Sequence, residues 1–314
     1  MNLLLTGANG FLGSCLVKDL QSKPDVNLTA AVRRRVEMPA AHFVEVHGID
    51  ASTDWSTNLL NQQVVIHSAA RAHIMKDKVV DRLAEYRRVN VDGTLNLARQ
   101  AAAAGVKRFI FISSIKVNGE QTPLGQSFTA DDEQAPKDAY GISKWEAEQG
   151  LRQLATETRM EVVIIRPPLV YGPGVKGNFA SMIKLVSTGL PLPFGAIQNQ
   201  RTLVAVDNLV DLIKICIDHP AAANQVFLAG DVKDLSTTEL FRGIANAMGK
   251  PARLIPVPQS LLKLSAMLLG KRAVAQRLLE SLQVDISKAQ NLLGWEPPIS
   301  VEEGLRRCFE SQDK

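Results

Sequence analysis

A glycine-rich turn close to the start of the chain constrains the fold more than any other feature. The apolar run Leu3–Leu5 leads directly into Thr6-Gly7-Ala8-Asn9-Gly10-Phe11-Leu12-Gly13, and a helical pattern follows. In such a turn the first glycine allows the tight bend, the second lets the backbone approach a pyrophosphate, and the third lets the helix pack on the strand. Since the helix start also presents unpaired amides to phosphates, this turn predicts a dinucleotide-binding βαβ unit.

The rest of the first half alternates short apolar runs with longer helical patterns. Strands are predicted at Leu3–Leu5, Leu28–Val32, Val64–His67, Phe109–Ser113 and Val162–Arg166, and helices at Phe11–Gln21, Arg82–Ala104 and Tyr140–Arg159. Strands that alternate with helices form parallel βαβ units with right-handed crossovers. The expected fold is therefore α/β, with a Rossmann-type doubly wound parallel sheet.

The sequence changes character after Arg166. Prolines and glycines crowd the stretch Pro167–Gly177, and a strand followed by a helix is predicted between Val204 and Asp218. We expect residues 1–168 to form the cofactor domain, together with a segment near 203–230 that returns to it. Residues 169–314 are expected to form a smaller mixed α/β substrate domain, with the active cleft between the two.

The end of the second predicted strand bears on the identity of the cofactor. A carboxylate there would hold the ribose 2′-hydroxyl of NAD, but this chain has Arg33, Arg34 and Arg35. Arginine suits a 2′-phosphate through bidentate hydrogen bonds, so NADP(H) is favoured and NAD(H) is the alternative. The competing interpretation of the arginines is a solvated basic loop. Asp50, which follows the predicted strand Val44–Ile49, is a weaker candidate for a contact with the adenine.

A tyrosine and a lysine suggest acid–base chemistry. Tyr140 and Lys144 are four residues apart and therefore share one face of a predicted helix. A free tyrosine has a pKa of about 10, and a nearby ammonium would lower it toward neutral pH. Lys144 could also hydrogen-bond the nicotinamide ribose. Ser113 and Ser114 end the preceding strand, and Ser114 is the better candidate to hold a reacting sugar oxygen, because of its position after the strand.

Together these motifs resemble those of the extended short-chain dehydrogenase/reductase family, in its nucleotide-sugar epimerase, dehydratase and reductase branch. The matching residues are Gly7, Gly10, Gly13, His67-Ser68-Ala69-Ala70, Asn90, Ser114, Tyr140 and Lys144. The run Arg166-Pro167-Pro168-Leu169-Val170-Tyr171-Gly172-Pro173 resembles the segment that leads into the sugar-nucleotide domain of that branch, and Asn178 and Arg201–Leu209 resemble its nucleotide-binding segments. The resemblance covers nearly the whole chain.

The resemblance implies which residues form the two binding sites. The cofactor would be contacted by Gly7, Asn9, Gly10, Phe11, Leu12, Gly13, Arg33, Asp50, Ala69, Ala70, Asn90, Tyr140, Lys144 and Pro167. A UDP-sugar would be held by Ser114 at the reacting oxygen and by Asn178 and Arg201 at the diphosphate or uridine. Arginine suits a pyrophosphate, and the alternative role for Arg201 is a surface salt bridge. No metal is expected.

The resemblance leaves the activity open within the branch. Members that eliminate water carry an Asp-Glu pair after the position of Ser114, where this chain has Ile115-Lys116, and Ile115 cannot transfer protons. The favoured activity is NADPH-dependent reduction of a UDP-4-keto-6-deoxy-hexosamine, which forms UDP-N-acetylquinovosamine for surface polysaccharide such as lipopolysaccharide O-antigen. The alternative is a UDP-sugar 4-epimerase with tightly bound NAD. A non-catalytic NADP(H)-binding sensor is less favoured, since Ser114, Tyr140 and Lys144 are all retained.

Charge and cysteine content restrict the partners. The formal net charge of +4 is small for 314 residues and the cations are scattered, so nucleic-acid binding is not expected. Cys15, Cys216 and Cys308 are far apart and suit reduced thiols rather than disulfides or a metal site.

Location and assembly are predicted from three further stretches. The N-terminus has no signal-peptide pattern, and Leu261–Leu269 is too short to cross a bilayer, so we expect a cytoplasmic enzyme without stable membrane insertion. Leu261–Leu269 instead predicts an amphipathic helix on a lid or a partner surface. The helices around Val89–Ala104 and Tyr140–Leu154 resemble the pair through which family members form homodimers.

Overall fold

The centre of the computed structural model, which describes residues 1–33, 42–72 and 81–310, is a sheet of seven parallel strands. The strands are β1 Asn2–Thr6, β2 Asn27–Val32, β3 His42–Glu45, β4 Val64–His67, β5 Arg108–Ile112, β7 Glu161–Arg166 and β10 Val226–Leu228. Their order across the sheet is β3-β2-β1-β4-β5-β7-β10. Every residue of β4 and β5 is buried, as expected where crossover helices cover both faces of a parallel sheet.

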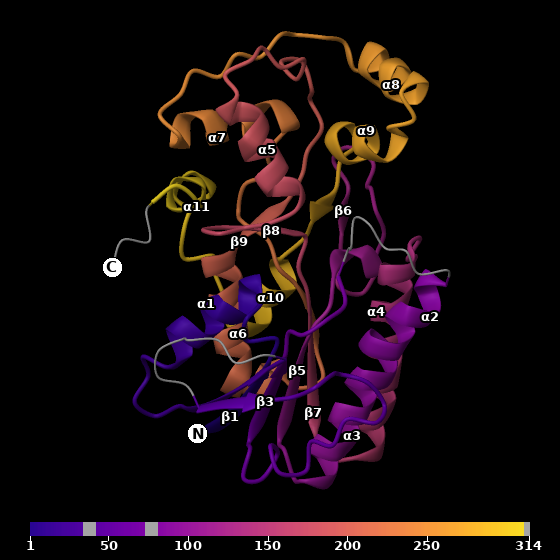
Figure 1. The fold of residues 1–314 in the computed structure, drawn as a ribbon, viewed down its shortest axis with the longest axis vertical. Helices are drawn as coiled ribbons and strands as arrows, with labels where there is room; N and C mark the ends of the chain where they lie inside the picture. Colours follow the sequence, from indigo (N-terminus) through magenta and orange to yellow (C-terminus); the bar gives the residue numbers. More distant parts are fainter. Residues whose placement is uncertain (34–41, 73–80, 311–314) are drawn as a thin grey trace.

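The side chains of β1 alternate between two apolar cores, one on each face of the sheet. Leu3 and Leu5 belong to the first core and Leu4 to the second. The first core is covered by α1 (Phe11–Leu20), α6 (Val206–Asp218) and α10 (Ser287–Leu293), and the second by α3 (Thr94–Ala103) and α4 (Ala139–Glu157). These two groups of helices flank the strands in Figure 1.

A smaller layer follows the carboxyl ends of the strands and lies above them in Figure 1. It holds two pairs of short parallel strands, β8 (Leu169–Tyr171) with β9 (Leu203–Ala205) and β6 (Ser127–Phe128) with β11 (Gln283–Val284). Its helices are α5 (Asn178–Ser187), α7 (Thr237–Ala247), α8 (Gln259–Leu268), α9 (Arg272–Leu279) and α11 (Val301–Arg307). A third apolar core, with Tyr171, Phe179 and Phe241 buried, holds this layer together.

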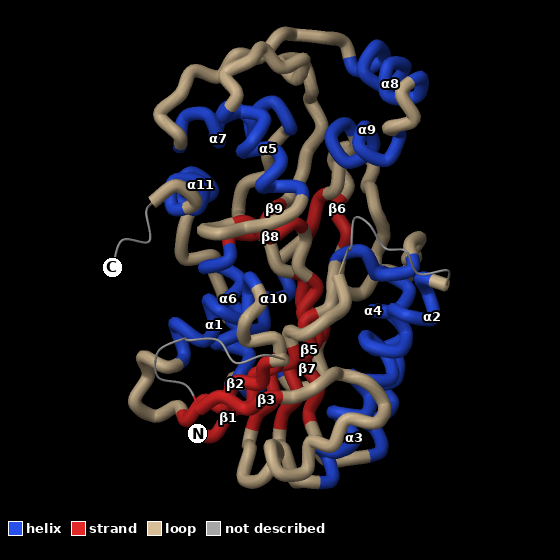
Figure 2. Tube along the Cα trace, viewed as in Figure 1, coloured by secondary structure: helices blue, strands red, loops and turns tan. Residues whose placement is uncertain are grey.

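The predicted fold class is confirmed, and most predicted elements agree with the structure within a few residues (Figure 2). The predicted helix Arg82–Ala104 is in fact three segments: α2 (Arg82–Arg87), a π-helical turn (Arg88–Gly93) and α3. The predicted strand Val44–Ile49 is wrong in its bounds, since β3 ends at Glu45 and leaves Asp50 in a turn. α6 and β10 lie in the segment near 203–230, and α10 packs beside them on the same core.

Two further findings concern the described part of the chain. None of its helices combines the length and the apolar character needed to span a bilayer. Its His, Cys, Asp and Glu side chains form no group of three or more that could hold a metal ion, and its three cysteines are free thiols.

Candidate active site

The glycine turn between β1 and α1 is required by close contacts. Gly7 has a φ of 72°, and a Cβ on it would lie 2.7 Å from the amide nitrogen of Ala69. A Cβ on Gly13 would lie 2.0 Å from the carbonyl oxygen of Gly7, which is far inside van der Waals contact. Gly10 caps α1 without a side chain, and Gly10 and Asn9 are both exposed, so no side-chain cap occupies the start of the helix. This cradle fits the pyrophosphate of a dinucleotide. Phe11 and Leu12 follow the turn and pack against the first core.

A buried hydrogen-bond network joins the end of β4 to the end of β1. Thr6 Oγ1 lies 2.7 Å from His67 Nδ1, and His67 Nε2 lies 3.0 Å from Thr94 Oγ1. Burial lowers the pKa of His67 to about 3, so its ring is neutral at physiological pH. The amide of Ala69 donates to Thr6 Oγ1 at 3.4 Å. The network therefore fixes the backbone before Ala70 between β1 and β4, where the order of the strands reverses and ligands of such sheets bind.

Asn90 lies in the π-helical turn, and both the oxygen and the nitrogen of its side-chain amide form hydrogen bonds within the protein. Its Oδ1 accepts from the Arg71 amide at 2.8 Å, and its Nδ2 donates to the Arg71 carbonyl at 3.1 Å and to Ser143 Oγ at 3.0 Å. These bonds hold the loop that follows Ala70 against α4. The geometry gives Asn90 a positioning role at the predicted cofactor site.

Tyr140 lies in the first turn of α4, next to a capping carboxylate. Asp138 Oδ1 accepts from the Gly141 amide at 2.7 Å and so fixes the start of the helix. The ring of Tyr140 is half-buried and contacts that of Tyr86 edge-on, with the centroids 6.0 Å apart. Burial raises the pKa of the Tyr140 phenol, and Asp138 and Tyr86 raise it further. The sequence predicted that Lys144 would lower the pKa of Tyr140. That prediction is wrong, because burial raises this pKa and is the largest effect on it.

Lys144 is buried four residues after Tyr140 on the same helix. Its Nζ donates to the Ile112 carbonyl at 2.7 Å, at the end of β5, and lies 4.3 Å from the centroid of the Phe111 ring. Burial lowers the pKa of Lys144 to about 7, although the carboxylate of Glu148 opposes the shift. The ammonium can therefore gain or lose its proton near neutral pH.

The two serines after β5 have different hydrogen-bond partners. Ser113 Oγ donates to Glu148 at 2.5 Å, and Glu148 forms a fully buried ion pair with Arg166. Ser114 Oγ accepts from the Lys116 amide at 3.3 Å, and no bond found among the described residues uses its hydroxyl hydrogen. The hydroxyl of Ser114 thus remains able to donate to a ligand, whereas that of Ser113 is committed to the protein.

Glu148 is the residue that sequence reasoning missed. It connects Ser113 to Arg166, whose Nη1 also donates to Asn118 Oδ1 at 3.0 Å. The available signal was its spacing, since Glu148 follows Lys144 by four residues and so shares its face of α4.

The remaining predicted cofactor residues, Arg33, Asp50 and Pro167, differ in their surroundings. Arg33 is exposed at the end of β2, while Arg34 and Arg35 lie outside the described residues. Asp50 stabilises its own turn, where Oδ1 accepts from the Ser52 amide at 3.0 Å, and Oδ2 pairs with Arg88 at 3.2 Å. The carbonyl of Pro167 accepts from the Ile115 amide at 3.0 Å, which ties the end of β7 to the loop after Ser114.

The predicted substrate residues belong to the smaller layer. Asn178 is the exposed first residue of α5. Arg201 Nη1 donates to the Glu280 carbonyl at 2.9 Å, and burial together with the like charge of Arg277 lowers the pKa of Arg201 to about 10.

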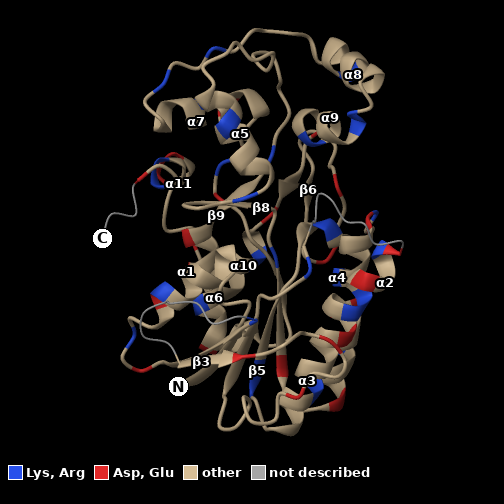
Figure 3. Cartoon of the chain, viewed as in Figure 1, with Lys and Arg blue, Asp and Glu red and all other residues tan. Residues whose placement is uncertain are grey.

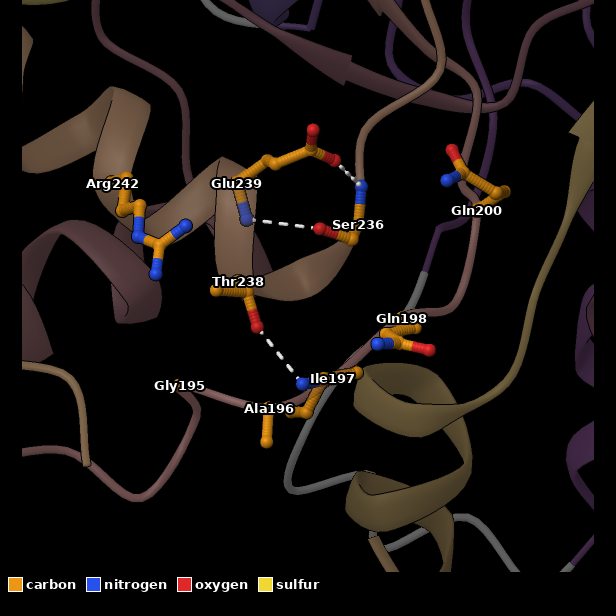
Figure 4. Close-up of a pocket in the computed structure, with 9 residues that line it drawn as sticks. All are labelled: Gly195, Ala196, Ile197, Gln198, Gln200, Ser236, Thr238, Glu239 and Arg242. Carbon is orange, nitrogen blue, oxygen red and sulfur yellow. Dashed lines mark hydrogen bonds between the residues drawn. The ribbon is translucent and has the colours of Figure 1, made fainter. Parts of the chain in front are cut away.

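An open pocket lies beside Arg201 in this layer. Its volume is about 510 Å³, and it lies between the loop before Arg201 and the start of α7 (Figure 4). The residues that line it are Gly195, Ala196, Ile197, Gln198, Gln200, Ser236, Thr238, Glu239 and Arg242. The bond from the Ile197 amide to Thr238 Oγ1, 3.0 Å long, fixes the loop to the helix.

Comparison with known proteins decides the family. The NAD dependent epimerase/dehydratase family model matches residues 3–230. The chain belongs to this family. A Vibrio cholerae protein named UDP-glucose 4-epimerase is 54% identical over 311 residues, which are 99% of this chain and 95% of the relative. The predicted membership and the prediction of an enzyme are both confirmed.

Solved structures of proteins named as epimerases have the same fold. UDP-glucuronic acid 4-epimerase from Bacillus cereus, in complex with NAD, aligns with a TM-score of 0.77 at 22% identity, over 98% of this chain and 97% of that one. UDP-glucose 4-epimerase from Thermotoga maritima, with UDP-glucose, aligns with a TM-score of 0.76 at 25% identity and the same coverage. Membership of an NAD-dependent family agrees with the glycine cradle described above.

Proposed function

We propose that this member of the family is an NAD-dependent UDP-sugar 4-epimerase. The observation that carries the proposal is the 54% identity to a protein named UDP-glucose 4-epimerase, spread over 99% of the chain. The sequence motifs favour a 4-keto reductase, with a 4-epimerase as the alternative. The similarity to this relative supports the epimerase more strongly. The geometry of Ser114, Tyr140 and Lys144 is compatible with either activity, because both need one proton donor and acceptor at C4.

Tyr140 is the proposed acid–base group. Burial keeps its phenol protonated at neutral pH in the protein alone, whereas oxidation at C4 needs the phenolate, which would accept the proton of the C4 hydroxyl and later return it. Positive charge from Lys144 and from the bound cofactor would favour that phenolate. When bound, NAD supplies the hydride acceptor and a positively charged ring. Lys144 is the proposed partner that holds the cofactor ribose and adds positive charge when it is protonated, and Ser114 is proposed to donate a hydrogen bond to the same sugar oxygen.

Arg201 is proposed to bind the diphosphate of the substrate. Its guanidinium is largely buried and lies close enough to Arg277 for the like charge to lower its pKa. A diphosphate between them would relieve this repulsion, which supports the assignment. Asn178, at the exposed start of α5, is proposed as a second contact with the nucleotide.

The finer cofactor and assembly predictions remain to be tested. The preference for NADP(H) depends on three arginines of which the structure describes only Arg33, whereas the family is NAD-dependent. A homodimer through the helices around Val89–Ala104 and Tyr140–Leu154, and a cytoplasmic location, stay predictions. Sedimentation velocity would test the dimer.

One experiment separates the two activities. The purified protein would be denatured to identify any released nucleotide, and the native protein would be incubated with UDP-glucose without added cofactor while NMR follows the sugar. We expect bound NAD and conversion of UDP-glucose to its C4 epimer, with Tyr140→Phe inactive. Consumption of one NADPH per UDP-4-keto-6-deoxy-N-acetylglucosamine, with no epimer formed from UDP-glucose or UDP-N-acetylglucosamine, would instead establish the reductase.

A further inference from the structure

α8 and the turn after it expose a run of large apolar side chains. No residue of α8 is buried. Leu261, Leu264 and Leu268 are 55%, 50% and 76% exposed, and their spacing of three and four residues places them on one face of the helix. The exposed surface continues through Met267, Leu269 and Val274. Contiguous apolar patches of this kind mark interaction sites, because isolated exposed leucines are common but rows of them are not.

The opposite side of α8 attaches it to the rest of the molecule. Gln259, Leu262 and Ala266 are the half-buried positions of the helix, and Lys263 forms an ion pair with Glu280 at 2.8 Å, just after α9. In Figure 1, α8 lies at the outer end of the smaller layer, with α9 between it and β6. The apolar row therefore projects from one end of the molecule rather than closing over its own core.

The charges that follow this row are basic. Residues 259–279 contain Lys263, Lys271, Arg272 and Arg277, and the next residue is Glu280. Figure 3 shows the basic residues on α8 and on α9. Lys263 is paired with Glu280 and Arg277 lies near Arg201, so Lys271 and Arg272 are the cations left beside the row. Exposed leucines followed by cations are typical of helices that lie in the interface of an anionic bilayer.

We propose that α8 and α9 dock this protein on the surface of an anionic lipid bilayer. The leucines of α8 would enter the boundary between headgroups and acyl chains, while Lys271 and Arg272 contact lipid phosphates. A second copy of the chain fits less well, because a two-fold contact through this face would bring Lys271 and Arg272 close to the same two cations of the other copy. A protein partner also fits less well, because interface cores are depleted in lysine.

The docking surface is continuous with the predicted substrate site. α9 ends at Leu279, and the next residue, Glu280, accepts the hydrogen bond from Arg201. A bilayer bound at α8 would therefore lie close to the loop that is proposed to hold a diphosphate. The proposal itself depends only on the surface of α8 and α9 and is independent of the reaction catalysed.

Vesicle sedimentation with the full-length protein tests the docking. We expect binding to vesicles of phosphatidylcholine with phosphatidylglycerol, weaker binding at high salt, and none to phosphatidylcholine alone. Leu264→Gln with Leu268→Gln should weaken binding at least about tenfold, since each leucine loses its apolar contact. Lys271→Gln with Arg272→Gln should weaken it roughly 25-fold, because each basic residue near an anionic surface contributes about fivefold.

The matched control removes exposed apolar side chains elsewhere. Leu60 and Val232 are 66% and 77% exposed and lie outside residues 259–279, so Leu60→Gln with Val232→Gln should bind as the parent does. Thermal unfolding of all variants should match the parent, which separates docking from misfolding. The proposal is overturned if anionic vesicles do not bind, if the control loses as much as the α8 variant, or if the α8 variant only turns a dimer into a monomer.

Discussion

The glycine turn of β1–α1 and the helix pair α8–α9 are determined in opposite ways. In the first region Leu3, Leu4 and Leu5 have no exposed surface, and Gly13 leaves no room for a Cβ. In the second, α8 has no buried residue. Packing within the chain thus accounts for the residues around the glycine turn, whereas it leaves the leucines on the outer face of α8 exposed.

Tyr140→Phe should have the largest effect of the substitutions considered, and it should lower kcat without changing stability. General acid–base groups contribute about 10²- to 10⁴-fold, so a loss of roughly 10³-fold in kcat is expected. The ring contact with Tyr86 remains, and the melting temperature and the bound nucleotide should be unchanged. Measuring kcat with the assay described above, alongside nucleotide released on denaturation, checks this. A variant that turns over at the parental rate would remove Tyr140 from the mechanism.

Gly13→Ala should cost about 3–5 kcal/mol of unfolding free energy, near the upper end for single substitutions. Its Cβ would lie 2.0 Å from the Gly7 carbonyl oxygen, so α1 must move away from β1. Gly48→Ala is the matched control, because its Cβ would meet nothing closer than Asp50 Oδ2 at 3.7 Å. The control should change stability by no more than about 1 kcal/mol. Equal denaturation midpoints for the two variants would refute the steric argument.

Leucine truncation should separate the two regions directly. Leu212 on α6 has no exposed surface and Leu268 on α8 is 76% exposed. Leu212→Ala should therefore lower the unfolding free energy by about 3 kcal/mol through cavity formation, and Leu268→Ala by less than about 0.5 kcal/mol. Urea unfolding measures both. If Leu268→Ala proved as costly as Leu212→Ala, α8 would be packed within the chain and no external partner would be needed.

The elements that the sequence predicted correctly are those that local sequence pattern determines. The strand Val64–His67 and the helix start at Phe11 agree with the structure, because both depend on local pattern and on one glycine turn. The π-helical turn at Arg88–Gly93 was not predicted, and it packs against a loop that is distant in sequence. A Cβ on Gly93 would lie 2.7 Å from the carbonyl oxygen of Ile49, so the helix passes directly over the loop before Asp50.

The candidate site was predicted by residue type better than by electrostatics. The spacing of Tyr140 and Lys144 identifies a pair on one helix face, but their pKa shifts depend on burial, which a spacing does not reveal. The role of Ser113 likewise depends on Glu148, which reaches it only through the packing of α4 on β5. The sequence therefore identifies the side chains of the candidate site, and the fold determines their burial and hence their protonation states.

Lys144→Met should raise the free energy of unfolding while it abolishes activity. This result would show that the buried lysine is kept for function although it destabilises the fold. Burial lowers the pKa of Lys144 from 10.5 to about 7, so between these values the unfolded chain binds more protons than the folded one. The stability contributed by the neutral amine is thus present above pH 10.5 and lost as the pH falls toward 7. At neutral pH and below, Met should gain about 1–3 kcal/mol, as when buried charges are replaced by apolar residues. The gain should shrink as the pH rises toward 10, which urea unfolding of parent and variant at pH 7 and pH 9.5, roughly, would show. A gain that does not depend on pH would mean that the ammonium of Lys144 is as well solvated in the folded protein as in the unfolded chain.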